Sequence, residues 1–209
     1  MNEIVECGGR RYVWTGSRWY GERDFLTPPG VIIHRLEALR PHTARSEASD
    51  RDCPKSLKAR WPDPLATDWL ERYPHLFDAD DYRCVTNQPT KHFWEWYAAI
   101  YLFKRDGAYS MVEKYDSKQE HAEKRARLAS ILSPEQLRAV RAVSDELWTP
   151  PKTQMPDLFV YMPDASRFWF AEAKGPSDDV RPNQARSHEI IERELGVPVE
   201  VLWFGLVDG

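Results

Sequence analysis

Two carboxylates and one lysine near the end of the chain have the types and spacing that metal-assisted hydrolysis requires. Asp157 follows Pro156, and Glu172 and Lys174 come next in a short Glu-Ala-Lys motif. A hard divalent cation prefers oxygen ligands such as carboxylates, and it can neutralise a phosphate and activate a water. A nearby ammonium group stabilises the negative charge that builds up on the phosphate. These residues therefore predict a site that hydrolyses phosphodiester bonds with a divalent cation.

The elements that must position these side chains are two strands and the turn between them. The sequence predicts a strand over 157–162, a turn over 163–166 and a second strand over 168–174. Side chains alternate along a strand, so Glu172 and Lys174 project from the same face. The turn folds the first strand back beside the second, which brings the two carboxylates together. Such charges among aromatic residues are costly unless they pair or bind a metal.

Helices are predicted before this strand pair. Positions 92–105 are apolar almost all round and stop before Gly107, as in a buried helix closed by a glycine. A charged helical stretch follows over 117–131. A third helix begins after Ser133 and runs to about Trp148, with Ser133 as its cap and Gln136 three residues later.

A helix over 183–195, closed by Gly196, and a strand over 199–204 complete the pattern. The order strand, strand, helix, strand after a helical region predicts an α/β (α+β) fold with a mixed sheet flanked by helices. The chain then divides into three regions: an aromatic β-hairpin appendage over 1–35, an irregular Pro-rich connection with short helices over 36–89, and a main domain over 90–209 with a helical insertion over 108–150.

The N-terminal hairpin is predicted from two aromatic stretches, Tyr12–Trp14 and Trp19–Tyr20, on either side of a glycine-containing turn. A short helix is predicted to begin within Val31–Leu39. A packing or docking unit is the simpler interpretation of the hairpin. Stacking of nucleic-acid bases on Trp14 or Trp19 is the alternative.

Composition excludes several classes of protein. The 209 residues are 42% hydrophobic and 30% charged, which is typical of a globular chain rather than a disordered one. No apolar run approaches the roughly 20 residues that a membrane span needs. The start of the chain lacks the pattern of a signal peptide, so we expect no membrane association and a cytoplasmic location. The three cysteines form no CxxC pair, which leaves a zinc ribbon without support.

The net charge of −4 argues weakly against a nucleic-acid partner, because Lys and Arg make most phosphate contacts. The charge is uneven, however, and one segment concentrates basic residues, namely Lys114, Lys118, Lys124, Arg125, Arg127, Arg138 and Arg141. A solvated helical face is the simpler interpretation, and a DNA-binding face is the alternative. His121 and His188 are predicted to be surface residues rather than ligands or bases.

One string of motifs resembles a known family. Met155-Pro156-Asp157-Leu158, then Glu172 to Asp178 (EAKGPSD), then Asn183-Gln184 at a helix start, is similar to the virus-type replication-repair nuclease (VRR-Nuc) branch of the PD-(D/E)xK superfamily. The resemblance covers residues 155–204 and implies a restriction-endonuclease-like fold. It also implies that Asp157 and Glu172 bind Mg²⁺ or Mn²⁺, that the carbonyl of Ala173 adds a ligand, and that Lys174 assists the water. Gln184 would line the site, or it serves only to begin its helix.

Members of this family also place a Glu on the helix before the sheet, ahead of a Gly. Glu95, on the helix that ends before Gly107, suits that position. The chain departs from the family pattern by its long insertion before Asp157 and by Gln154-Met155, which replaces the Gly often found before the Pro-Asp. The insertion leaves Glu113 as a rival to Glu95. A first-turn carboxylate also favours the positive end of a helix dipole, which is the simpler interpretation of Glu95.

The resemblance implies a metal-dependent hydrolase that cleaves DNA, with branched or flapped DNA in repair, recombination or phage–host conflict as typical settings. The alternative from another class is a non-catalytic DNA- or protein-binding module on a nuclease fold. The N-terminal region is the candidate surface for a homodimer contact or a protein partner.

Overall fold

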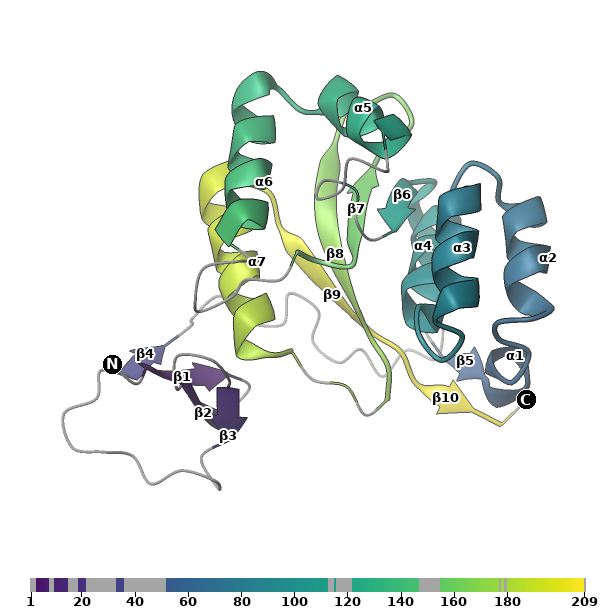
Figure 1. Cartoon of the computed structure of the whole chain (residues 1–209), viewed down its shortest axis with the longest axis horizontal. Coiled ribbons are helices and arrows are strands. Elements are labelled where there is room, and N and C mark those ends of the chain that lie inside the picture. Colours follow the sequence, from purple (N-terminus) through teal and green to yellow (C-terminus); the bar gives the residue numbers. More distant parts are fainter. Residues whose placement is uncertain are drawn as a thin grey trace.

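A four-stranded mixed sheet forms the centre of the molecule (Figure 1). The computed structural model describes residues 52–112, 115, 122–146, 155–176, 178 and 180–208, with the backbone of four short strands nearer the N-terminus. The sheet has the order β6-β7-β8-β9 and consists of Tyr109–Val112, Leu158–Tyr161, Phe168–Lys174 and Val199–Trp203. β7 is antiparallel to β6 and β8, whereas β9 runs parallel to β8. The predicted mixed sheet flanked by helices is thereby confirmed.

The β7–β8 hairpin has the predicted strands and turn. Its register pairs Leu158 with Ala171 and Tyr161 with Phe168, and the Met162 amide donates to the Arg167 carbonyl across the turn. Alternation of side chains gives β8 two different faces. Trp169, Ala171 and Ala173 join one core cluster, and Phe170 joins the other. Glu172 and Lys174 share the face of Phe170, as the spacing predicted.

Strand β6 lies at the start of the segment predicted as a helical insertion over 108–150. It begins directly after α4 and forms an edge of the central sheet beside β7. Met111 and Val112 are both buried but lie in different core clusters, as alternation requires. The remainder of the insertion carries helix α5 (Ala122–Ile131) and helix α6 (Pro134–Glu146). The capping box predicted for α6 is present in both directions: the Gln136 amide donates to Ser133 Oγ, and the Ser133 amide donates to Gln136 Oε1.

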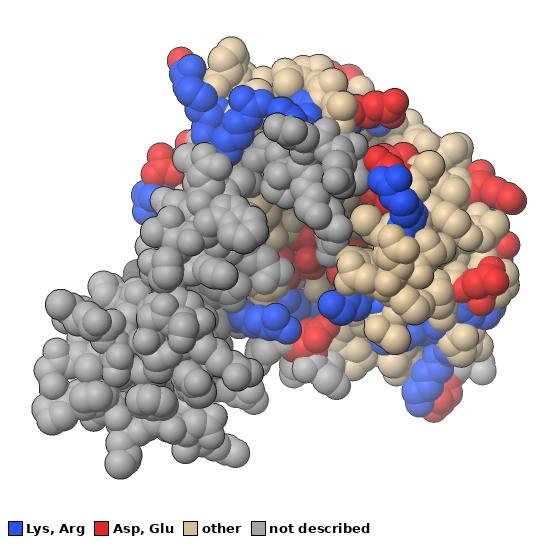
Figure 2. Space-filling model, viewed as in Figure 1, with Lys and Arg blue, Asp and Glu red and all other residues tan. Residues whose placement is uncertain are grey.

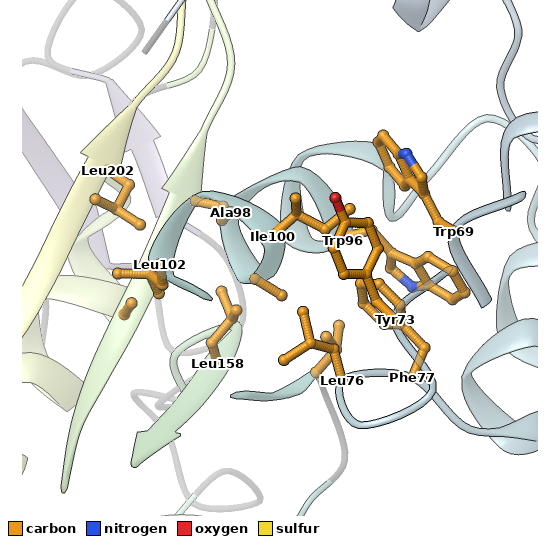
Figure 3. Close-up of a cluster of buried hydrophobic side chains, with 14 of the residues drawn as sticks. Trp69, Tyr73, Leu76, Phe77, Trp96, Ala98, Ile100, Leu102, Leu158 and Leu202 are labelled. Carbon is orange, nitrogen blue, oxygen red and sulfur yellow. The ribbon is translucent and has the colours of Figure 1, made fainter. Parts of the chain in front are cut away.

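Helix α4 (Phe93–Asp106) covers one face of the sheet with an aromatic core (Figure 3). Trp96 stacks on Phe77 with ring centroids 3.9 Å apart, and Leu102 and Leu158 continue the cluster toward the strands. The helix ends at Gly107, whose φ of 68° is a left-handed conformation that favours glycine. Helix α4 is thus buried on several sides, which explains why its residues are apolar almost all round.

Short helices before α4 form an outer layer on the same face. They are α1 (Lys55–Lys58), α2 (Leu65–Arg72) and α3 (Ala79–Asn87), and α2 and α3 contribute Leu65, Trp69 and Val85 to the core around α4. Strand β5 (Cys53–Pro54) pairs with β10 (Leu206–Val207), so this segment also contacts the far end of the chain. The predicted short helices are therefore present, and they belong to the same hydrophobic core as the sheet.

The opposite face of the sheet packs against α5, α6 and α7 (Pro182–Leu195). Phe159 and Phe170 of the strands meet Leu128 of α5 and Ile191 of α7 in this second cluster. Helix α7 ends at Gly196, again with a left-handed φ of 65°. The parallel strand β9 follows, so α7 is the crossover connection between β8 and β9. This helix therefore passes directly over the face that carries Glu172 and Lys174.

Four N-terminal strands form a separate small sheet (Figure 1). They are β1 (Glu3–Cys7), β2 (Arg10–Trp14), β3 (Trp19–Gly21) and β4 (Ile33–Arg35). The predicted aromatic hairpin is confirmed as β2–β3, with Trp14 opposite Trp19. The helix predicted within 31–39 is wrong at 33–35, because β4 pairs with β1 and strand pairing outweighs the local pattern. No helix in the part of the chain that the structure describes is long and apolar enough to cross a membrane.

A buried ion pair joins the insertion to the outer helical layer. Lys124 of α5 donates to Asp81 of α3 and to the carbonyl of Val112, and both charged side chains are at most 8% exposed. The pair lies near a cavity of about 170 Å³ whose lining includes His75, Ser110, Lys124 and Arg127. Burial raises the pKa of Asp81 to about 6, although the charge of Lys124 opposes this shift.

The raised pKa of Asp81 predicts a specific dependence of stability on pH. The folded chain holds the Asp81 proton up to about pH 6, whereas the unfolded chain loses it near the ordinary value of 3.8. The folded state therefore binds more protons in this window, and its stabilisation relative to Asp81→Asn falls as pH rises from 4 to 7. We expect the difference in unfolding free energy between the two proteins to change by about 3 kcal/mol. Urea unfolding of both proteins across this range measures it, and parallel pH profiles would contradict the assignment.

Candidate active site

The predicted motif residues meet at the end of the β7–β8 hairpin that lies away from its turn. The pairing of Leu158 with Ala171 places Asp157, just before β7, beside Glu172 near the end of β8. The Ala173 amide donates to Asp157 Oδ2 at 2.9 Å, which fixes this carboxylate against the strand. The antiparallel register is thus the physical cause of the convergence of two carboxylates that are distant in the sequence.

Glu172, Lys174 and Gln184 form a buried network on the face covered by α7. Lys174 Nζ lies 2.7 Å from Glu172 Oε1 and donates to Gln184 Oε1 at 3.0 Å. The amide group of Gln184 also donates to Glu172 Oε1. Glu172 is 0% exposed, and Lys174 and Gln184 are 6% and 3% exposed. A charge pair at this depth is costly to desolvate, so hydrogen bonding by Gln184 offsets part of that cost.

Gln184 begins its helix and also contacts the lysine of the motif. It is the third residue of α7, and its Oε1 accepts the Arg181 amide at 3.0 Å, which caps the helix. The same oxygen accepts Lys174 Nζ, as described above. The start of α7 is therefore tied to the lysine at the end of β8, and Pro182 at the first helical turn supports the same helix start.

The two carboxylates of the hairpin ionise differently. Burial, together with the negative charges of Glu172 and Glu95, raises the pKa of Asp157 well above its ordinary value. Burial also disfavours the charged form of Glu172, but the neighbouring Lys174 and His188 outweigh it and lower the pKa of Glu172. The surroundings of Asp157 thus disfavour its negative form, and a nearby cation would offset this effect.

Glu95 reaches the neighbourhood of the hairpin from the first turn of α4. Its carboxylate is near enough to raise the pKa of Asp157, and it lies 3.9 Å from Nδ1 of His92. The side chain of Trp94 in this first turn of α4 packs against Gly175, just after β8. A Cβ placed on Gly175 would lie only 2.3 Å from the Trp94 indole nitrogen. Glycine after the Glu-Ala-Lys motif therefore permits close contact between α4 and β8. The rival residue Glu113 lies outside the described residues.

His188 corrects the prediction of a surface histidine. It lies one helical turn after Gln184 on α7, is 3% exposed, and has Nε2 at 3.9 Å from Glu172 Oε2. The spacing of four residues from Gln184 was the signal for this position, because such residues share a helix face. His121 lies outside the described residues.

The oxygen atoms of this site suit a hard cation, although they do not form a closed cage. Within the residues that the structure describes, no group of three or more His, Cys, Asp or Glu side chains is arranged to hold a metal. Glu172 Oε2, however, is buried and has no hydrogen-bond partner among them. Mg²⁺ keeps several waters and needs only one or two protein carboxylates, so Asp157 and Glu172 fit its chemistry.

The basic segment is only partly a solvated face. Lys124 is buried in its pair with Asp81, and Arg127 donates to the Tyr161 hydroxyl while remaining exposed. Arg138 and Arg141 of α6 are exposed, whereas Lys114 and Lys118 lie outside the described residues. Figure 2 shows Lys and Arg side chains over the upper part of the molecule and below a hollow in which acidic side chains are visible.

The domain thus combines a mixed sheet, whose central hairpin carries Asp, Glu and Lys at one end, with a Gln from the next helix. Residues 95–203 match the model of the VRR-NUC domain family, which is just over half of the chain, and the chain belongs to this family. The match includes both the hairpin and the insertion with α5 and α6. Comparison with curated proteins and with solved structures gave no match. Membership assigns a nuclease-type function with DNA as the substrate.

Proposed function

We propose that this chain is a deoxyribonuclease that hydrolyses phosphodiester bonds with Mg²⁺ or Mn²⁺. The observation that carries the proposal is the buried contact of Lys174 with Glu172 at 2.7 Å, beside Asp157, which directly precedes the neighbouring strand. An ammonium group and two carboxylates at one strand end are the groups that metal-assisted hydrolysis needs.

Each residue of the site has a distinct task in this proposal. Asp157 and Glu172 would hold the cation, with the carbonyl of Ala173 as a further oxygen ligand and Glu95 as a fourth contributor from α4. When bound, the cation supplies charge neutralisation at the phosphate and a more acidic water.

Lys174 stabilises the negative charge that develops on the phosphate. Gln184 keeps its ammonium in place, since Gln184 Oε1 is itself fixed by the Arg181 amide. This bond to a helix start gives the lysine a defined position before DNA binds, which is the condition for efficient electrostatic catalysis.

Exposed basic side chains of the insertion suit a DNA backbone. Exposed arginines of α6 can contact phosphates without reading sequence, which favours recognition of DNA structure over base sequence. We propose branched or flapped DNA as the substrate, in repair, recombination or phage–host conflict within the cytoplasm. The buried Glu172–Lys174 pair favours an enzyme over a non-catalytic binding module, because a module gains nothing from the desolvation cost of these charges.

A panel of labelled DNAs tests both the activity and the substrate. Duplex, single-stranded, flap and four-way-junction DNAs are incubated with the full chain and Mg²⁺ or Mn²⁺, with EDTA as the control. We expect metal-dependent products from the flap or the junction at rates above those for plain duplex. Binding of these DNAs without cleavage under any metal condition would instead support the binding module.

A further inference from the structure

His188 is the side chain next to Glu172 that the proposed mechanism does not use. It comes from α7, one turn beyond Gln184, and it is buried to nearly the same degree as Gln184. Its Nε2 lies 3.9 Å from Glu172 Oε2. This distance is longer than a direct hydrogen bond, so the two atoms are close without bonding to each other.

Both atoms of this pair are fully buried, and neither has a hydrogen-bond partner among the residues that the structure describes. A buried polar atom without a partner costs about 1–3 kcal/mol. Two such atoms that lie close together across a short gap indicate a ligand that bonds to both of them.

The chemistry of the two atoms favours a cation in that gap. Oε1 of Glu172 already accepts from Lys174 and Gln184, so Oε2 is the oxygen that remains for a metal. Metal–oxygen and metal–nitrogen bonds are each about 2.0–2.2 Å long, so two atoms on opposite sides of one ion lie about 4 Å apart. The separation of 3.9 Å falls within this reach.

We propose that His188 Nε2 is a nitrogen ligand of the cation held by Glu172 Oε2, an inference that rests on the proposed function. A nitrogen ligand determines metal preference, because Mg²⁺ selects oxygen ligands and first-row transition ions accept imidazole. Of the two ions considered above, the site therefore prefers Mn²⁺. Glu172 and His188 are the protein ligands of this proposal, and waters fill the remaining positions.

Electron spin echo envelope modulation of bound Mn²⁺ tests this ligand without DNA or catalysis. The full chain is treated with chelator, desalted and loaded with less than one equivalent of Mn²⁺. We expect modulation from a directly bonded ¹⁴N nucleus, and its replacement by the ¹⁵N pattern when the protein is made with ¹⁵N-labelled histidine. This comparison needs no variant and is independent of any effect of mutation on folding.

His188→Gln identifies the histidine, and His75→Gln is its matched control. Nε2 of His75 is also buried with no partner among the described residues, but His75 lines the cavity beside α5. We expect the nitrogen signal to disappear and Mn²⁺ affinity to fall at least about 10-fold in His188→Gln, because loss of a residue that only supports a metal ligand already costs that much. Both should be retained in His75→Gln. Mn²⁺ bound with oxygen ligands only, or a nitrogen signal that persists in His188→Gln, would overturn the inference while leaving a nuclease intact. Failure of the wild type to bind Mn²⁺ would overturn it together with the proposed metal.

Discussion

Asp157→Asn is expected to reduce metal-dependent DNA cleavage by about 10³-fold, since a bound cation contributes several kcal/mol of stabilisation to the transition state. The substitution keeps an oxygen that can accept the Ala173 amide, so the local backbone is preserved. It removes the negative charge that burial, Glu172 and Glu95 already disfavour at this position. The metal-free variant should therefore have a melting temperature equal to or above that of the wild type. Cleavage rates and thermal unfolding, measured on the same preparations, check both parts.

Asp164→Asn is the matched control for this substitution. Asp164 lies on the same hairpin but at the exposed turn, where it accepts the Ser166 amide. Its replacement should leave the cleavage rate within about twofold of the wild type, because it is remote from the reacting groups. Equal activity of Asp157→Asn and Asp164→Asn would contradict the role assigned to Asp157.

Lys124→Met is expected to lower the free energy of unfolding by about 3–5 kcal/mol, because it leaves Asp81 buried without its cation. The double variant Asp81→Asn/Lys124→Met should recover most of that loss, since neither buried charge then remains. Asn at position 81 also retains an oxygen for the Asp78 amide, which protects the cap of α3. Denaturant unfolding of the wild type, both single variants and the double variant gives the coupling energy.

Arg138→Met controls for loss of a basic residue from the insertion. Arg138 is exposed on α6, so its replacement should change stability by no more than about 0.5 kcal/mol. A double variant as unstable as Lys124→Met alone would show that the pair does not act as a unit. The result matters for function, because the ion pair links α5 to α3, and α3 shares a hydrophobic core cluster with α4.

The part of the fold closest to the motif was predictable because its signals are local. Strand β8 begins with four apolar residues and alternates apolar and polar positions over 171–174, and the turn before it is marked by Pro163 and the residues that follow. Helix ends at Gly107 and Gly196 follow from the freedom of glycine to adopt positive φ. These short-range rules indicated where Asp157, Glu172 and Lys174 would lie, and the structure brings them together. Their catalytic roles remain predictions.

Other features depend on contacts between distant segments and leave little local signal. Strand β6 has only four residues, too few for a clear alternation, and it is ordered by pairing with β7. Lys124 resembles a solvated helical lysine because its partner Asp81 is 43 positions away. His188 could have been assigned to the buried face of α7 from its spacing to Gln184. Its proximity to Glu172, by contrast, depends on how α7 lies across the sheet.

Metal add-back to chelated protein shows directly whether cleavage depends on a cation at Asp157. Wild-type chain and Asp157→Asn are treated with EDTA, desalted and incubated with labelled flap DNA while Mn²⁺ or Mg²⁺ is titrated in. The site described here predicts no cleavage without metal, a rate that saturates with added metal for the wild type, and a rate about 10³-fold lower for the variant. Cleavage that persists in EDTA, or that Asp157→Asn catalyses at the wild-type rate, would contradict it.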